Sequence, residues 1–430
     1  MRRLVALLLS AIALLPGVLT EGNALLSHET LSYHTSFAWG DYFPGVSPQY
    51  VHLIPYLVPW VRTHGLLCFT LTMMALNLLE LAMVFDVLLR VVRKEWVALA
   101  LFVPCLALAV HPIPGQWTVT DYALSVHHPA KTFGPIVLLW LVSWDAFPLT
   151  PLVATLVAIN NVDYGIPAFI VTAIVDLRRS NGKDWRLWLI ASGGAALFLP
   201  DMSIQMQYGK YGFGDFPMPD LGMHWLFYGV FLAAAVYGWR NRHSVLLWLG
   251  GMGFGSMVYY MGRSHPYSLL ISFSFLGPCI ALLAWETRHA LSPTLAALFA
   301  LMVVDVVNFP RPDLKRLFGN DPRFSQALDF MAGHVRSSGE KTVLISYPFG
   351  KLIAMKAGVT DIDPYGVGGE IHTTEQGKRV CEATARVRAV FGTVPPFVEA
   401  CMADQGFVEV ADTAIPDIYA FASHFQEWRR

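Results

Sequence analysis

Long apolar runs, separated by polar stretches, constrain the fold of this chain more than any other feature. Charged residues make up only 14% of the 430 residues, whereas a typical soluble domain has about 25%. Runs of about 20 apolar residues are typical of helices that cross a membrane. The sequence therefore predicts an α-helical polytopic membrane protein, with apolar runs near 4–20, 65–89, 95–111, 187–200, 222–239, 244–262, 267–285 and 293–308.

The apolar block 133–177 contains more apolar residues than one membrane crossing would need. Because proline interrupts helices, this block is expected to form short or broken helices. The predicted break points are Pro135, Pro148, Pro151 and Pro167. Together with the other runs, and with 4–20 retained as a first helix rather than cleaved as a signal peptide, this gives about 9–11 transmembrane helices.

Basic residues divide the connecting segments into two groups. Twelve of the 16 Lys and Arg residues before residue 311 fall in segments that can share one face, which the positive-inside rule makes cytoplasmic. Placing these twelve residues on one face requires an odd number of membrane crossings within 133–177. The large polar loops 21–64, 112–132 and 201–221 fall on the other face. Only four cations fall there before residue 311: Arg62, Lys131, Lys210 and Arg263.

The first outer loop carries a recognisable layout. An acidic residue, Glu29, is followed about a dozen positions later by Gly40–Pro44 (GDYFP) and then by the proline-rich apolar segment 51–61. This layout over residues 1–310 resembles the GT-C superfamily of integral membrane glycosyltransferases, which use polyprenyl-phosphate sugars. The resemblance implies transfer with inversion at the anomeric carbon. Many members have paired acids in this loop, whereas this chain has a single acid at Glu29.

Sugar transfer to a hydroxyl group requires a base beside the acceptor oxygen. The resemblance assigns that role to an acid of the first loop, either Glu29 or Asp41, with Glu21 as a third alternative. The competing interpretation is that these acids only solvate an exposed loop.

Cations on the outer face are expected to hold the phosphate of the donor, since arginine and lysine are the side chains suited to phosphate. Arg263, His265, Lys131 and Lys210 are the candidates, and lipid-headgroup anchoring is the alternative for Arg263. His34 of the first loop is a further candidate for substrate binding. Asn160 and Asp163 interrupt an apolar block, and the resemblance implies contact with acceptor or donor.

Cofactor motifs are not apparent in the sequence. It has no P-loop, dinucleotide fingerprint or diagnostic zinc-ligand spacing, so no organic cofactor and no metal site are predicted. Asp121, His127 and His128 are ligand types without a diagnostic arrangement. The sequence predicts no metal site, but it leaves open whether the reaction uses a divalent cation as a cofactor.

The tail from residue 311 to 430 has a different composition, with 14 of the 30 Lys and Arg residues and no long apolar run. The stretch 341–350 predicts a buried strand and a turn, 325–338 and 374–392 predict helices, and 406–412 and 417–423 predict late strands. We expect a soluble extracytoplasmic α/β domain. Its two cysteines, Cys381 and Cys401, are expected to form a disulfide.

These features together predict a multi-pass enzyme of the plasma membrane. It would transfer a sugar from a polyprenyl-phosphate donor to a glycan or lipid acceptor at the outer leaflet, with membrane lipids as further partners. A net charge of −1 gives no indication of nucleic-acid binding. Two alternatives stay open: a transporter or flippase of a lipid-linked or anionic substrate, and a glycan polymerase or ligase.

Overall fold

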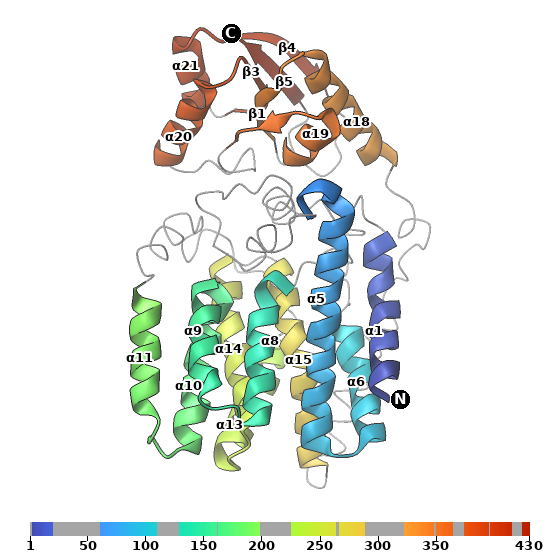
Figure 1. The fold of residues 1–430 in the computed structure, drawn as a ribbon, viewed down its shortest axis with the longest axis vertical. Coiled ribbons are helices and arrows are strands. Elements are labelled where there is room, and N and C mark those ends of the chain that lie inside the picture. The colour runs from blue at the N-terminus through green and yellow to red at the C-terminus, as the bar shows by residue number, and fades with distance from the viewer. Residues whose placement is uncertain are drawn as a thin grey trace. The chain divides into compact units, whose positions relative to one another are not determined.

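The computed structural model forms two compact units (Figure 1). The helical unit contains α1, α5 from Thr70 onward, and the helices from α6 to α15, and the C-terminal unit contains the elements from α18 to β5. The structure describes residues 2–19, 61–109, 129–160, 162–197, 225–263, 266–288, 322–347, 350–363, 374–394, 396–414 and 424–430.

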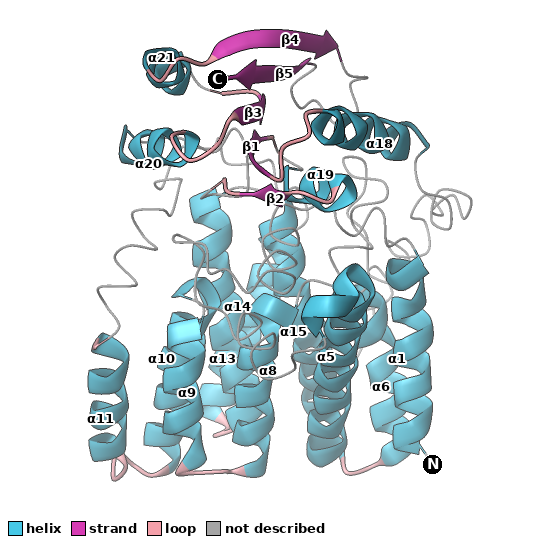
Figure 2. Ribbon diagram, turned by 45° about the horizontal axis from the view of Figure 1, so that its top comes forward, coloured by secondary structure: helices cyan, strands magenta, loops and turns pink. Residues whose placement is uncertain are grey.

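Helices of the helical unit lie side by side and are joined by short connections where the chain is described (Figure 2). Short connections make successive helices antiparallel neighbours. The helices are α1 (Arg2–Leu19), α5 (Val61–Val92), α6 (Glu95–Ala109), α8 (Pro129–Trp144), α9 (Leu149–Asn160), α10 (Val162–Arg179), α11 (Trp185–Ala196), α13 (Trp225–Arg240), α14 (Ser244–Arg263) and α15 (Pro266–Thr287).

The prediction of a polytopic membrane fold is wrong for this structure. Among the residues described, no helix combines the length and the apolar character that crossing a membrane requires. Several helices are short: α9 and α11 have 12 residues each and α6 has 15, against the roughly 20 residues of a typical span. The 32-residue α5 contains the acidic residues Glu80 and Asp86 in its second half.

The block 133–177 forms three helices, α8, α9 and α10, so the expectation of short helices there is confirmed. The expected odd number of membrane crossings is not, because none of these helices is long and apolar enough to span a membrane. Pro148 lies between α8 and α9, as predicted. Pro135 and Pro167 lie inside α8 and α10 rather than at breaks, so these two positions were wrong. Pro151 lies in the first turn of α9, where proline costs no helical hydrogen bond.

Glycines allow helices of this unit to approach closely. A Cβ added at Gly250 of α14 would lie 2.4 Å from the backbone nitrogen of Ala235 in α13. One added at Gly165 of α10 would lie 2.1 Å from the carbonyl oxygen of Val157 in α9. Beside these contacts, the fully buried Trp248 donates its indole N–H to Thr172 Oγ1 at 2.9 Å. The helix pairs are thus fixed by backbone contact as well as by side-chain packing.

The C-terminal unit is a mixed sheet between helices. The strands have the order β2-β1-β3-β5-β4, with β2, β1 and β3 parallel and β5 antiparallel to both β3 and β4. The elements are α18 (Pro322–Ser337), β1 (Thr342–Ser346), α19 (Gly350–Ala357), β2 (Thr360–Asp361), α20 (Thr374–Thr384), β3 (Ala389–Gly392), α21 (Pro396–Asp404), β4 (Val408–Ala414) and β5 (His424–Arg429).

Both faces of this sheet are covered, so β1 is apolar throughout instead of alternating. Val343 and Ile345 belong to the core shared with α18 and α19, whereas Leu344 belongs to the core shared with α20 and α21. The predictions for β1, α18, α20 and β4 are confirmed. The predicted helix 374–392 was too long, because its last residues form β3. The strand predicted at 417–423 lies outside the described residues.

Candidate functional site

One end of the helical unit, here called the basic end, is defined by contacts of Asp86 near the end of α5. Its carboxylate accepts hydrogen bonds from Arg3 of α1 at 2.9 Å, Arg90 at 3.0 Å and the Trp140 indole of α8 at 3.0 Å. Burial of Asp86 opposes ionisation, but the bonds from Trp140 and Arg90 and the nearby positive charges hold its pKa below the usual value. The start of α1 and the ends of α5 and α8 therefore meet here.

Arg179 and Arg178 extend the basic end to α10 and α13. Arg179 at the end of α10 donates to Asp145 at 2.9 Å and to the carbonyl oxygen of Val142 at 2.7 Å, and Arg178 donates to the carbonyl oxygen of Trp239 at the end of α13. The expectation that twelve basic residues share one end is confirmed. They are Arg2, Arg3, Arg90, Arg93, Lys94, Arg178, Arg179, Lys183, Arg186, Arg240, Arg242 and Arg288.

The other end of the helical unit, here called the opposite end, is where α8, α10 and α15 begin and where α9 and α14 finish. Four of the predicted site residues have backbone positions at this end. Lys131 lies in the first turn of α8, Asn160 is the last residue of α9, Asp163 is the second residue of α10, and Arg263 is the last residue of α14. Residues separated by up to 132 positions in the chain therefore share one end.

Backbone dipoles at the opposite end are balanced. Among the described helices α8, α10, α13 and α15 begin at this end, where an N-terminus carries a partial positive charge, and α1, α6, α9, α11 and α14 finish there, where a C-terminus carries a partial negative charge. Lys131 adds a formal positive charge within the first turn of α8. Arg263 is at a helix C-terminus, where a cation also complements the dipole of its own helix. The remaining predicted site residues, Glu29, His34, Asp41, Lys210 and His265, lie outside the described part of the chain.

A buried acid near the opposite end was not singled out from the sequence. The Oγ1 hydroxyl of Thr132, the residue after Lys131, donates to Glu80 Oε2 of α5 at 2.9 Å. Glu80 is 6% exposed and Thr132 is fully buried. Burial raises the pKa of Glu80 to about 8, and the hydrogen bond from Thr132 only partly offsets that effect. Glu80 is therefore mostly protonated at neutral pH.

Asn77 is the second buried polar residue of this group. It lies three positions before Glu80 on α5, on the same face of the helix, and is 6% exposed. Within the part of the chain that the structure describes, its side-chain nitrogen Nδ2 has no hydrogen-bond partner. A buried amide without a partner costs about 1–3 kcal/mol and requires an explanation.

The sequence contains a signal for these residues. Asn77 and Glu80 stand in the apolar run 65–89, where an acid and an amide are conspicuous. The sequence does not show that Thr132, which belongs to a different helix, contacts Glu80. Among the described residues, no group of three or more His, Cys, Asp or Glu side chains is arranged to hold a metal ion.

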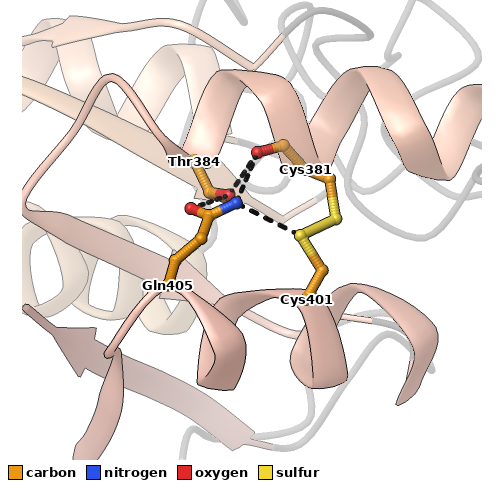
Figure 3. Close-up of a disulfide and its surroundings, with 4 residues drawn as sticks. All are labelled: Cys381, Thr384, Cys401 and Gln405. Carbon is orange, nitrogen blue, oxygen red and sulfur yellow. Dashed lines mark hydrogen bonds between the residues drawn. A yellow bond between two sulfur atoms is a disulfide. The ribbon is translucent and has the colours of Figure 1, made fainter.

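In the C-terminal unit, Cys381 of α20 and Cys401 of α21 form the expected disulfide (Figure 3). Gln405 holds both partners in place: its side-chain nitrogen donates to the carbonyl oxygen of Cys381 at 3.0 Å and to Cys401 Sγ at 3.2 Å. Thr384 donates to the Gln405 side-chain oxygen at 3.0 Å. The disulfide thus joins two helices on one face of the sheet.

Two buried acids of the C-terminal unit hold elements of the fold together through polar contacts. Asp361 Oδ1 accepts the backbone N–H groups of Ile345 at 2.9 Å and Asp363 at 3.0 Å, which fixes the end of β2 beside β1. Glu427 on β5 lies 2.6 Å from His334 Nε2 of α18. Both acids therefore join elements of the fold to one another.

Comparisons with known proteins provide little beyond this geometry. No protein-family model matches the chain, and no characterised protein matches it. Among solved structures, the chain is similar to the crystal structure of the Archaeoglobus fulgidus oligosaccharyltransferase in the apo form. The identity is 11%, the TM-score is 0.37, and the match covers 98% of this chain and 74% of that one. Similarity at this level does not assign the chain to a family.

Proposed function

We propose that this protein is a glycosyltransferase that moves a sugar from a polyprenyl-phosphate donor to a glycan or lipid acceptor. The observation that carries the proposal is that Lys131 and Arg263, 132 positions apart in the chain, have backbone positions at the opposite end together with Asn160 and Asp163. Two cations beside hydrogen-bonding residues suit a phosphate and the sugar bonded to it.

In the proposed reaction a first-loop carboxylate, Glu29 or Asp41, takes the proton of the acceptor hydroxyl. The acceptor oxygen forms a new bond to the anomeric carbon as the bond from that carbon to the phosphate oxygen breaks. The electron pair of the broken bond stays on the phosphate, and the configuration of the anomeric carbon is inverted. Because negative charge develops on the phosphate, cations beside it stabilise the transition state.

The proposed roles of the other residues follow from this chemistry. Arg263, His265, Lys131 and Lys210 would hold the phosphate, with arginine giving bidentate contact and lysine a point charge. His34, Asn160 and Asp163 would contact the sugar or the acceptor through hydrogen bonds. The layout of the first loop, with Glu29 followed by Gly40–Pro44, supports the proposal from the sequence.

We further propose that the protein meets its donor at the plasma membrane, since a polyprenyl chain is anchored in lipid, and that the C-terminal unit is extracytoplasmic. The disulfide between Cys381 and Cys401 supports that location because disulfides persist in oxidising compartments.

Transfer of a radiolabelled sugar from a polyprenyl-phosphate donor by the purified full-length protein tests the proposed reaction. The Glu29→Gln and Asp41→Asn variants distinguish the two candidate bases. We expect one of them to lose about 10²-fold or more in kcat, as removal of a general base does, while the other stays within a few-fold of the wild type. Wild-type activity in both variants would refute the assignment of the base to this pair.

A further inference from the structure

We propose that Asn77, Glu80 and Thr132 form a binding site for a neutral, hydroxyl-bearing sugar group near the opposite end of the helical unit. The proposal rests on the proposed function and deepens it, because it specifies the class of sugar that the donor carries. The three residues come from two helices, α5 and α8.

Hydrogen bonding is the first argument. Thr132 Oγ1 donates to one carboxyl oxygen of Glu80 at 2.9 Å, so these two side chains are already held together. Asn77 Nδ2 is buried and has no partner among the described residues. A hydroxyl oxygen of a ligand is an acceptor that would satisfy this amide, and a protonated Glu80 would offer a donor to the same ligand.

Position is the second argument. Thr132 lies in the first turn of α8, directly after Lys131, which is proposed to hold phosphate. Asn77 is three residues before Glu80 on α5, which corresponds to about 4.5 Å along the helix axis. In a donor, the sugar is bonded directly to the phosphate. The site thus lies at the same end of α8 as the residue proposed to hold the phosphate.

Charge is the third argument, and it selects the class of sugar. Among the described residues, burial raises the pKa of Glu80 and the hydrogen bond from Thr132 lowers it, and no cation contributes. An ionised Glu80 would therefore have no compensating cation among the described residues. An uncharged carboxyl, an amide and a hydroxyl recognise uncharged hydroxyl groups. A uronic acid would bring a second carboxyl group into a buried site without a compensating cation, which is costly. We therefore infer a neutral sugar.

Binding to the full-length protein tests the inference, with three probes: citronellyl phosphate, citronellyl-phosphate mannose and citronellyl-phosphate glucuronic acid. For the wild type we expect the mannose probe to bind at least about tenfold more tightly than the glucuronic acid probe. Asn77→Leu should weaken binding of the mannose probe by about tenfold, the loss expected when a buried hydrogen bond to ligand is removed. Binding of citronellyl phosphate should stay the same in that variant.

Asp176→Asn is the matched control. Asp176 is also a buried acid that accepts a hydrogen bond from a threonine, Thr150, but it lies near the basic end. This variant should bind all three probes as the wild type does. An equal loss for both the mannose probe and citronellyl phosphate in Asn77→Leu, or no loss for either, would overturn the sugar site.

A second measurement, made on the wild type, separates this inference from the proposed function. In the wild type, the infrared C=O stretch of protonated Glu80, identified by its loss in Glu80→Gln, should shift when methyl mannoside is added. A shift would support the sugar site even if citronellyl phosphate failed to bind. Failure of citronellyl phosphate to bind would count against the phosphate donor alone. An unchanged band at saturating methyl mannoside would overturn the site.

Discussion

The carboxyl group of Glu80 makes the stability of the helical unit depend on pH. Its pKa is raised from 4.5 to about 8 in the folded state, so the folded protein retains a proton that the unfolded chain releases. The contribution of Glu80 to stability is therefore complete below pH 4.5 and is lost as pH rises through about 8. The loss is on the order of a few kcal/mol.

Glu80→Gln should remove this dependence, because glutamine does not titrate and can still accept the hydrogen bond from Thr132. Between about pH 6 and pH 8, where Asp176 with its pKa of about 6 is already ionised, we expect the free energy of unfolding, measured by urea denaturation, to fall with pH in the wild type and to change much less in the variant. A slope that is the same in both proteins would show that Glu80 titrates normally.

Thr172 provides a second prediction at the scale of one residue. It accepts the indole N–H of Trp248, and both side chains are fully buried. Thr172→Val keeps the shape but leaves the indole without a partner, so it should lower the free energy of unfolding by about 1–3 kcal/mol. Thr155→Val is a control at a part-buried threonine whose hydroxyl, among the described residues, bonds to the backbone carbonyl groups of Pro151 and Ala191, and it should cost less.

At the scale of elements, the contact between α13 and α14 depends on Gly250. A methyl group there would lie 2.4 Å from the backbone of Ala235, which cannot move out of the way as a side chain can. We expect Gly250→Ala to destabilise the protein by about 1–3 kcal/mol, as overpacking does. Gly229 of α13 has no atom within 4 Å of its added Cβ, so Gly229→Ala should stabilise the protein by up to about 1 kcal/mol through helix propensity. Thermal unfolding of the two variants compares these effects.

The disulfide between α20 and α21 closes a loop with a sequence separation of 20 residues. For a loop of that length, chain entropy predicts a stabilisation of about 3 kcal/mol. Cys381→Ser combined with Cys401→Ser should therefore lower the urea midpoint of the C-terminal unit, and reductant should lower that of the wild type similarly. If reductant leaves the wild-type midpoint unchanged, the disulfide does not stabilise this unit.

The sequence was sufficient to predict most helices of the helical unit, but the prediction that they are membrane spans was wrong. Apolar runs located helices such as α14 and α15 to within about two residues, since these helices bury much of their surface in the core. Pro148 was correctly assigned to a break, but Pro135 and Pro167 were not, because a proline inside a helix is tolerated where packing compensates. The 12-residue α9 agrees with the expectation of short or broken helices in the block 133–177.

The candidate site was predictable only in part, for a physical reason. Single residues such as Lys131 and Arg263 stand out in the sequence because they are cations among apolar neighbours. The pairing of Glu80 with Thr132 depends on how α5 packs beside α8, and no local pattern encodes that contact. The same holds for β3, which is only four residues long and was included in the helix before it.

At the scale of the whole molecule, we propose that the C-terminal unit lies outside the cytoplasm. Glu399 on α21 is exposed, so Glu399→Cys should react with a membrane-impermeant maleimide in intact cells. Labelling that occurs only after lysis would contradict this location, whereas the wild type, with Cys381 and Cys401 paired, provides the background.

The central claim is that the opposite end of the helical unit holds the donor phosphate and the basic end does not. Arg263 and Arg242 are the matched pair that tests it, since both are arginines of the helical unit, at the end of α14 and just before its start. The decisive measurement is kcat/KM for sugar transfer from a polyprenyl-phosphate donor by Arg263→Ala and Arg242→Ala. We predict a loss of about 10²-fold or more for Arg263→Ala, the scale expected for a transition-state charge contact, and wild-type activity for Arg242→Ala. Equal activities of the two variants would contradict the account.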